Sequence, residues 1–382
     1  MTILISFTEL LLYICFSILI GSFILMLVPE DRRPPVYVPK KLLYIAAIVI
    51  PLAALLPVIN TAQILAANRS FSFIFKNVLF TFEIGKSWIF IVIVTAILIR
   101  ILVVKSFRSN RMLPGLALAL TILILLGYTN SSHAASITEW SGFIYHTLHF
   151  LSVTVWIGIL FTVGFFASEK SNWQAFLKWF TPLAVACITV ALVSGYFTMG
   201  IDINSYDDPD ATILQEYQNS LIVNYGQALF IKHLLVLSLI LFAIINGILF
   251  RKKSEEPGFS PVKWVKVESV YAFFVFGTTA FMGQSWPPHQ IYSLVNSYGA
   301  SPLFKALYGG ELVEAIKSAE KTGVFNISIA FGLQSYILFL LGIVFMGITI
   351  VASVKRRSAP VSFIAALLMA LSLYFGVMMG IQ

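Results

Sequence analysis

Long apolar runs separated by short polar segments make up most of this chain of 382 residues. A helix needs about 20 mostly apolar residues to cross the hydrocarbon core of a bilayer. The sequence predicts a transmembrane helix in each of ten such runs: 7–28, 42–65, 88–106, 113–129, 143–166, 180–200, 225–250, 267–285, 326–352 and 360–380. The pattern therefore indicates an all-α, polytopic membrane protein.

Composition strengthens this prediction. Hydrophobic residues make up 59% of the chain and charged residues 11%, whereas a soluble domain carries about 25% charged residues. Cys15 and Cys187 both lie in apolar runs, and two cysteines are too few for a disulfide scaffold or a thiolate metal cage. We expect no cleavable signal peptide, because the first run is long enough to span the membrane and no basic segment precedes it.

Basic residues concentrate in alternate loops, which predicts the orientation of the chain. The positive-inside rule places those loops in the cytoplasm and both termini on the extracytoplasmic side. The net charge of +8 is therefore a topology signal and does not indicate a nucleic-acid-binding surface. This set holds 17 of the 25 basic residues: Arg32, Arg33, Lys40, Lys41, Lys105, Arg108, Arg111, Lys170, Lys178, Arg251, Lys252, Lys253, Lys263, Lys266, Lys355, Arg356 and Arg357.

The first eight predicted helices resemble two parallel four-helix repeats, of the kind built into many transporters. Ile20-Gly21 aligns with Ile157-Gly158, and Ile84-Gly85-Lys86 aligns with Tyr225-Gly226-Gln227. The fourth helix then ends near His133 and the eighth near His289. The prediction divides the chain into a first four-helix unit (1–135), a second four-helix unit (136–290), an extracytoplasmic loop with short amphipathic helices (291–325) and two C-terminal transmembrane helices (326–382).

The repeat also predicts where the chemistry lies. Under these alignments His149 pairs with Leu12, and His146 pairs with Glu9. Lys232-His233 pairs with Ile91-Val92. Polar intramembrane groups are therefore concentrated in the second unit, and we expect the functional site there.

The histidines are the first candidate metal ligands. His146 and His149 are three residues apart and share a helix face, and Trp156 lies two turns further along that face. His133 and His289 end the fourth and eighth helices at the predicted outer side. His146 alone is equally well explained as a polar cap at the headgroup level.

Two methionines extend the predicted ligand set. Met199 and Met282 lie near the outer ends of the sixth and eighth helices. Thioether and imidazole ligands together suit Cu(I), and imidazole alone suits copper, zinc or haem iron. Methionine is also common filler in apolar cores, so packing is the alternative for each of them.

A second group of candidates would line a translocation path or a second site. Lys232 and His233 lie about two turns into the seventh helix, and ionisable residues at that depth mark functional sites. Tyr225 precedes them, and Trp156 belongs to the same group. Glu268 opens the eighth helix on the cytoplasmic side. For Glu268 a favourable interaction with the helix dipole is the simpler explanation.

Several classes of function are excluded or disfavoured. The chain has no glycine-rich phosphate loop, no paired catalytic carboxylates and no Ser/His/Asp arrangement. We therefore expect no nucleotide or nucleic-acid partner, no ATP-driven transport on this chain and no enzymatic activity.

Residues 143–290 resemble the CopD copper-resistance family of bacterial membrane proteins. The motifs that carry the resemblance, in order, are the run His149 to Gly158, Ser194-Gly195, the run Tyr225 to Lys232, the run Ala243 to Asn246, Glu268 and Pro287-Pro288. The resemblance implies copper transport, usually uptake, in the cytoplasmic membrane of a bacterium, with Cu(I) or Cu(II) as the ion. Four residues fall on family motif positions: His149, Trp156, Gly226 and Lys232.

The resemblance also bears on partners. Some relatives carry a fused copper-binding β domain, and this sequence has none. An extracytoplasmic copper donor would then be a separate protein.

Two alternatives stay open at this point. The spacings His-x(6)-Trp and Gly-x(5)-Lys are also similar to those of a small membrane protoporphyrinogen oxidase that holds b-type haem. In that reading His149 and His233 ligate the haem, and the protein is an electron-transfer protein or oxidase. The second alternative is an assembly factor that presents copper without moving it.

Overall fold

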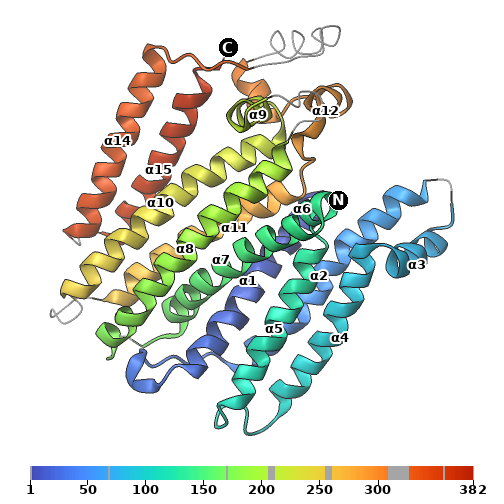
Figure 1. Cartoon of the computed structure of the whole chain (residues 1–382). Helices are drawn as coiled ribbons and strands as arrows, with labels where there is room; N and C mark the ends of the chain where they lie inside the picture. The colour runs from blue at the N-terminus through green and yellow to red at the C-terminus, as the bar shows by residue number, and fades with distance from the viewer. Residues whose placement is uncertain are drawn as a thin grey trace. The chain divides into compact units, whose positions relative to one another are not determined.

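Ten helices are long and apolar enough to cross a membrane, and no strand occurs in the part of the chain that the structure describes. The computed structural model describes residues 2–67, 69–168, 171–204, 211–253, 260–308, 327–355 and 358–381. The ten helices are α1 (Thr2–Leu27), α2 (Lys40–Ala66), α4 (Glu83–Val103), α5 (Met112–Asn130), α7 (Trp140–Phe166), α8 (Trp173–Ile203), α10 (Asn224–Lys253), α11 (Pro261–Gly283), α14 (Leu333–Val354) and α15 (Ala359–Met378). The predicted all-α membrane fold is confirmed (Figure 1).

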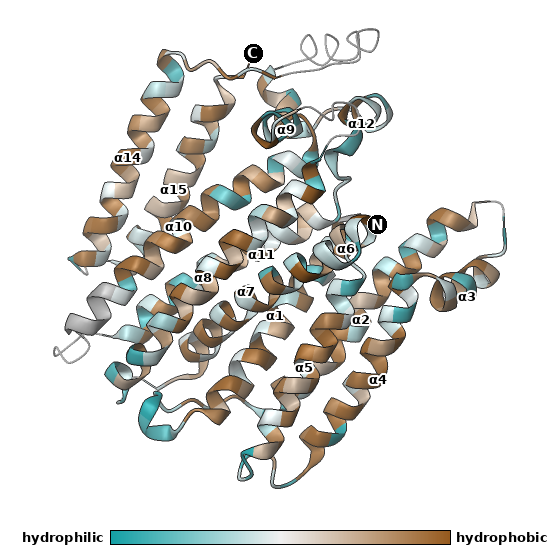
Figure 2. Ribbon diagram, in the orientation of Figure 1, coloured by the Kyte–Doolittle hydropathy of each residue, from teal (hydrophilic) through white to brown (hydrophobic). Residues whose placement is uncertain are grey.

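Short helices connect several of these spans. They are η1 (Glu30–Arg32), α3 (Phe71–Thr81), α6 (His133–Thr138), α9 (Ile213–Ser220), η2 (Pro288–Gln290) and α12 (Ile291–Tyr298). Residues 302–308 are also helical, as the amphipathic pattern in the predicted outer loop indicates. The second amphipathic stretch of that loop, 311–317, lies outside the described residues. Apolar residues cover the long helices, and polar residues gather at their ends and in the connections (Figure 2).

The chain divides into two compact units, and the boundaries between them fall within three of the long helices, α8, α10 and α11. The first unit comprises residues 1–201 and 247–269, and the second comprises 202–246 and 270–382. Each unit is described by itself below.

Close packing of α1 against α7 organises the first unit. Tyr13 on α1 contacts Phe150 on α7, with ring centroids 5.3 Å apart. Further along both helices, a Cβ added at Gly21 would lie 2.0 Å from the carbonyl oxygen of Gly158. The two contacts share one register, so α1 and α7 run parallel. Only glycine permits so close an approach of two backbones.

This contact bears on the predicted repeat, because Gly21 and Gly158 are the residues that the repeat aligns. Two parallel helices that meet at equivalent residues are expected around a pseudo-twofold axis. The division into two four-helix repeats stays a prediction, and the α1–α7 register supports it.

In the second unit α14 packs along α15, and a buried polar contact ties α15 to α10. The Tyr374 hydroxyl donates to Gln227 Oε1 at 2.5 Å. The Gln227 amide donates to the Leu221 carbonyl and contacts Met378 Sδ at 3.7 Å. Gln227 is almost completely buried, so the last helix of the chain satisfies a polar group of α10 that would otherwise be costly.

Candidate cation site

Four polar side chains from three separate segments converge in the second unit. Asp202 ends α8, Tyr225 and Lys232 lie on α10, and His289 lies on η2. The Tyr225 hydroxyl donates to Asp202 Oδ2 at 3.0 Å. Asp202 also interacts electrostatically with Lys232 and His289. We call these four residues the Asp202 cluster.

His289 is held in a defined orientation within this cluster. Its side chain is buried, and Nδ1 lies 2.6 Å from the carbonyl oxygen of Asn204. Since a carbonyl only accepts, Nδ1 donates its proton to Asn204, which fixes the orientation of the ring. This is the arrangement in which second-shell carbonyls orient metal-binding imidazoles. The rigid Pro287-Pro288 step precedes the ring in the chain and restricts its backbone.

Asp202 carries the least satisfied polar atom of the cluster. Its Oδ1 is shielded from solvent and has no hydrogen-bond partner among the residues that the structure describes. A carboxylate oxygen left in that state is costly, and a positive group beside it offsets the cost. Lys232 supplies a positive charge. The cluster is thus built around a carboxylate that favours a nearby cation.

His233 faces a different neighbour from Lys232, as expected for adjacent residues on a helix. Its Nδ1 lies 2.8 Å from the Tyr217 hydroxyl, and the two rings stack with centroids 5.7 Å apart. Burial raises the pKa of the Tyr217 phenol, which keeps its hydroxyl group protonated. His233 is therefore engaged with α9.

In the first unit, His149 packs tightly against α8. Its Nδ1 lies 2.8 Å from the Ala191 carbonyl oxygen and donates to it. A Cβ added at Gly195 would lie 2.8 Å from the same nitrogen. The glycine of the Ser194-Gly195 motif therefore makes room for the imidazole.

His146 and Trp156 lie on the same helix as His149 but have other neighbours. The His146 ring contacts Phe150, with centroids 6.4 Å apart, and Phe150 in turn packs against α1. His146 thus belongs to the α1 side of α7, and His149 belongs to the α8 side. Trp156 is buried further along α7.

The other predicted site residues lie in separate places. His133 is exposed at the start of α6, whereas Met199 and Met282 are half-buried in α8 and α11. Glu268 is buried within α11. Among the described residues, no three His, Cys, Asp or Glu side chains are grouped so as to hold a metal ion. The predicted ligand roles of these residues stay predictions.

Sequence reasoning missed the part that Asp202 takes in the cluster. The residue follows directly after the predicted sixth span (180–200) and was not among the predicted site residues. The structure continues α8 to Ile203, which brings the carboxylate to Tyr225. An acidic residue directly after an apolar run was the signal that could have identified it.

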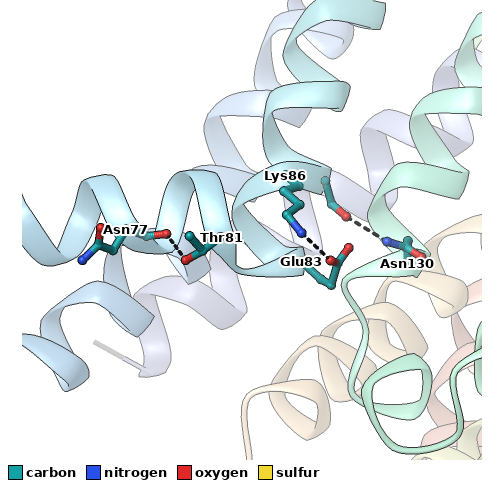
Figure 3. Close-up of polar contacts among 6 residues, drawn as sticks. Asn77, Thr81, Glu83, Lys86 and Asn130 are labelled. Atoms are coloured by element: carbon teal, nitrogen blue, oxygen red, sulfur yellow. Dashed lines mark hydrogen bonds and ion pairs between the residues drawn. The ribbon is translucent and has the colours of Figure 1, made fainter.

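A second polar group occurs where the repeat places the counterpart of Tyr225, at the start of α4. Lys86 Nζ lies 2.9 Å from Glu83 Oε1, and the Asn130 amide donates to Ser87 Oγ at 3.2 Å (Figure 3). Thr81 donates to the Asn77 carbonyl at 2.5 Å one turn earlier. A shallow pocket lies between these groups, Phe90 and Phe143. Both partners of the ion pair are largely solvent-exposed.

Two family models match the chain. The model described as Copper resistance protein D matches residues 174–282. The model described as Copper resistance protein D-like, N-terminal domain, matches residues 1–143. The first includes Asp202, Tyr225 and Lys232 and ends before His289. No curated protein and no solved structure matches the chain. The haem alternative gains no support from these matches.

Proposed function

Because this chain belongs to the CopD copper-resistance family, whose members act in copper resistance or handling, we propose that it moves copper ions across the cytoplasmic membrane in the direction of uptake. The observation that carries the proposal is the Asp202 cluster, in which a partly buried carboxylate and an oriented imidazole converge within the matched region or directly after it. We propose no enzymatic activity.

Asp202 and His289 are the proposed copper ligands. The carboxylate oxygen Oδ1 and the imidazole Nε2 form an oxygen and nitrogen pair, which accepts Cu(II) readily. Met282 lies at the end of α11, seven residues before His289 in the chain. Its thioether would add a soft donor for Cu(I). The Tyr225 hydroxyl fixes the carboxylate through its bond to Oδ2.

Lys232 competes with the copper ion for the Asp202 carboxylate. Its ammonium group supplies positive charge near Asp202 when no copper is bound. An arriving copper ion displaces that charge from the carboxylate, and the returning ammonium helps to release the ion. Such exchange keeps binding weak enough for the ion to leave, as conduction requires.

His149 and Trp156 complete the proposal in the first unit. The bond from His149 Nδ1 to the Ala191 carbonyl orients the imidazole, and His149 falls on a family motif position, so we propose it as a further copper contact. We place both termini and the Asp202 cluster on the extracytoplasmic side, where a separate copper-binding protein would deliver the ion.

The test uses purified protein in proteoliposomes, with copper supplied outside and internal copper measured by mass spectrometry. We expect wild-type protein to accumulate copper, and Asp202→Asn and His289→Ala to lose most of that accumulation. Lys232→Gln should bind copper more tightly than wild type and transport it more slowly. Lys86→Gln is the matched control, because it removes an exposed lysine at the repeat-related helix start.

Three outcomes would contradict the proposal. Wild-type protein that binds copper without accumulating it inside the vesicles would be an assembly factor that presents the ion. Unchanged copper binding in both Asp202→Asn and His289→Ala would place the site elsewhere. A Soret band in the purified protein that is lost in His149→Ala would restore the haem alternative.

A further inference from the structure

A carboxyl group lies inside the apolar part of the first unit, on α1. Glu9 is 7% exposed, although it belongs to a membrane-spanning helix. Intramembrane carboxyl groups are costly and mark ion pathways or proton relays. Neither family match assigns this residue a part, and the sequence pattern alone identified it only as the repeat partner of His146.

A chain of hydroxyl groups leads to this carboxyl group from α5. The Tyr128 hydroxyl donates to the Tyr13 hydroxyl at 3.4 Å. The Tyr13 hydroxyl donates to Glu9 Oε2 at 3.3 Å. Tyr128 is half-buried and lies two residues before the end of α5, whereas Tyr13 is buried. The chain therefore links a residue near the end of α5 to a buried carboxyl group one turn before Tyr13 on α1.

Aromatic rings enclose the inner end of this chain. Phe150 packs against Tyr13 and Phe16, with ring centroids 5.3 and 5.5 Å away. Phe16 also contacts Tyr128. The enclosed hydroxyl groups form a polar route to Glu9.

Three helices pack on α1, namely α2, α5 and α7, and each carries titratable residues. Tyr128 faces it from α5. His146 lies one turn before Phe150 on α7, just as Glu9 lies one turn before Tyr13 on α1, so the parallel register places both at one level. The titratable residues of α2, which are Lys40, Lys41 and Tyr44, lie in its first turn or directly after it. Because α2 begins after the end of α1 and Glu9 lies near the start of α1, these groups lie at the end of the helix pair away from Glu9.

We propose that Glu9, Tyr13 and Tyr128 form a proton-exchange site, and that copper movement is accompanied by proton movement through it. Tyr13 transfers its hydroxyl proton to the Glu9 carboxylate, Tyr128 transfers its own to the Tyr13 oxygen, and Tyr128 takes a proton from water at the membrane surface. Reversal of the three transfers releases the proton. The coupling to copper rests on the proposed function, whereas the proton exchange does not.

The exchange is tested without copper, by infrared difference spectroscopy of the purified protein between acidic and alkaline buffer. We expect a carboxylic C=O band that Glu9→Gln removes and Glu9→Asp restores with a shift in frequency. Glu268→Gln is the control, because it removes another buried carboxyl group from a transmembrane helix and should leave this band in place. A spectrum in which Glu9→Gln removes no band would overturn the proton-exchange site.

The relay is tested with Tyr13→Phe, which keeps the ring contacts and removes the hydroxyl. We expect the Glu9 band to persist, and its shift in heavy water to develop more slowly than in wild type. An unchanged rate would overturn the relay.

The coupling is tested in proteoliposomes that contain a pH-sensitive dye. Copper addition should move protons in wild type and move none in Glu9→Gln. If copper crosses with no proton movement, the coupling is overturned. If copper does not cross and the infrared band still depends on Glu9, the proposed function fails and the proton-exchange site stands.

Discussion

The starts of α4 and α10 have similar backbone packing, but the polar side chains at the two starts differ. Each follows a short helix whose last turn presses on a glycine: a Cβ would lie 2.2 Å from the Val78 carbonyl at Gly85 and 2.1 Å from the Ser220 carbonyl at Gly226. At the start of α4, Glu83 and Lys86 form an exposed ion pair. At the start of α10, Tyr225 is buried and bonded to Asp202.

The difference extends two turns into both helices. Ile91 is buried on α4, and its repeat partner on α10 is Lys232. Val92 and its partner His233 are both exposed positions. If the predicted repeat holds, equivalent positions carry a buried apolar residue on α4 and a half-buried ammonium group on α10. Of these two similarly built helix starts, only the start of α10 carries the candidate site chemistry.

The largest expected effect comes from filling the glycine positions. Gly226→Ala and Gly85→Ala should each destabilise the protein by about 3 kcal/mol, because the new methyl group meets backbone atoms that must move. Only Gly226→Ala should also weaken copper binding, since Tyr225 is its neighbour. Thermal unfolding in detergent and copper titration would measure the two effects. Gly277→Ala is the control, because a Cβ there meets nothing within 4 Å. Equal copper affinity in both variants would contradict the comparison.

A smaller effect is expected when Lys232 is changed to Met. Without its ammonium group the Asp202 carboxylate loses a compensating charge, and we expect a loss of about 2 kcal/mol in the free energy of unfolding. Adding Asp202→Asn should recover part of that loss, as a double-mutant cycle would show. Copper should stabilise Lys232→Met more than it stabilises wild type, because the ion then binds without a competitor. Strictly additive single and double variants would argue against an interaction between the two residues.

The smallest effect is expected at the exposed ion pair of α4. Glu83→Gln should change the free energy of unfolding by less than about 1 kcal/mol, because water and salt screen charges at exposed positions. Copper accumulation should not change. Measurement of stability at low and high salt would check the screening, and a large loss of copper transport would show that the first copy also carries a site.

The sequence predicts the spans well because their length and apolar character depend on the bilayer alone. Boundaries depend on more than that. The ninth span was expected from residue 326, yet α14 begins at Leu333, whereas α8 begins at Trp173, before the expected residue 180. Trp173 and Trp179 are amphipathic residues that extend a helix into the interface without adding to an apolar run.

The site was predictable only in part. Tyr225, Lys232 and His289 were expected to be functional from their depth and position in the sequence. Their convergence on Asp202 depends on how far α8 continues and on how the chain folds back at η2, and neither follows from hydrophobic periodicity. Glu9 shows the same limit, since its hydroxyl partner Tyr13 is local but Tyr128 comes from a distant helix.

The bond between Tyr374 and Gln227 has a consequence for biogenesis. The helix that carries Tyr225 and Lys232 emerges from the ribosome long before α15 does, and until then the Gln227 carboxamide lacks the hydroxyl that it accepts from in the finished protein. The buried polar contact of α10 is therefore completed only after α15 is inserted, so a chain that stops before residue 374 would leave the Gln227 carboxamide without this bond.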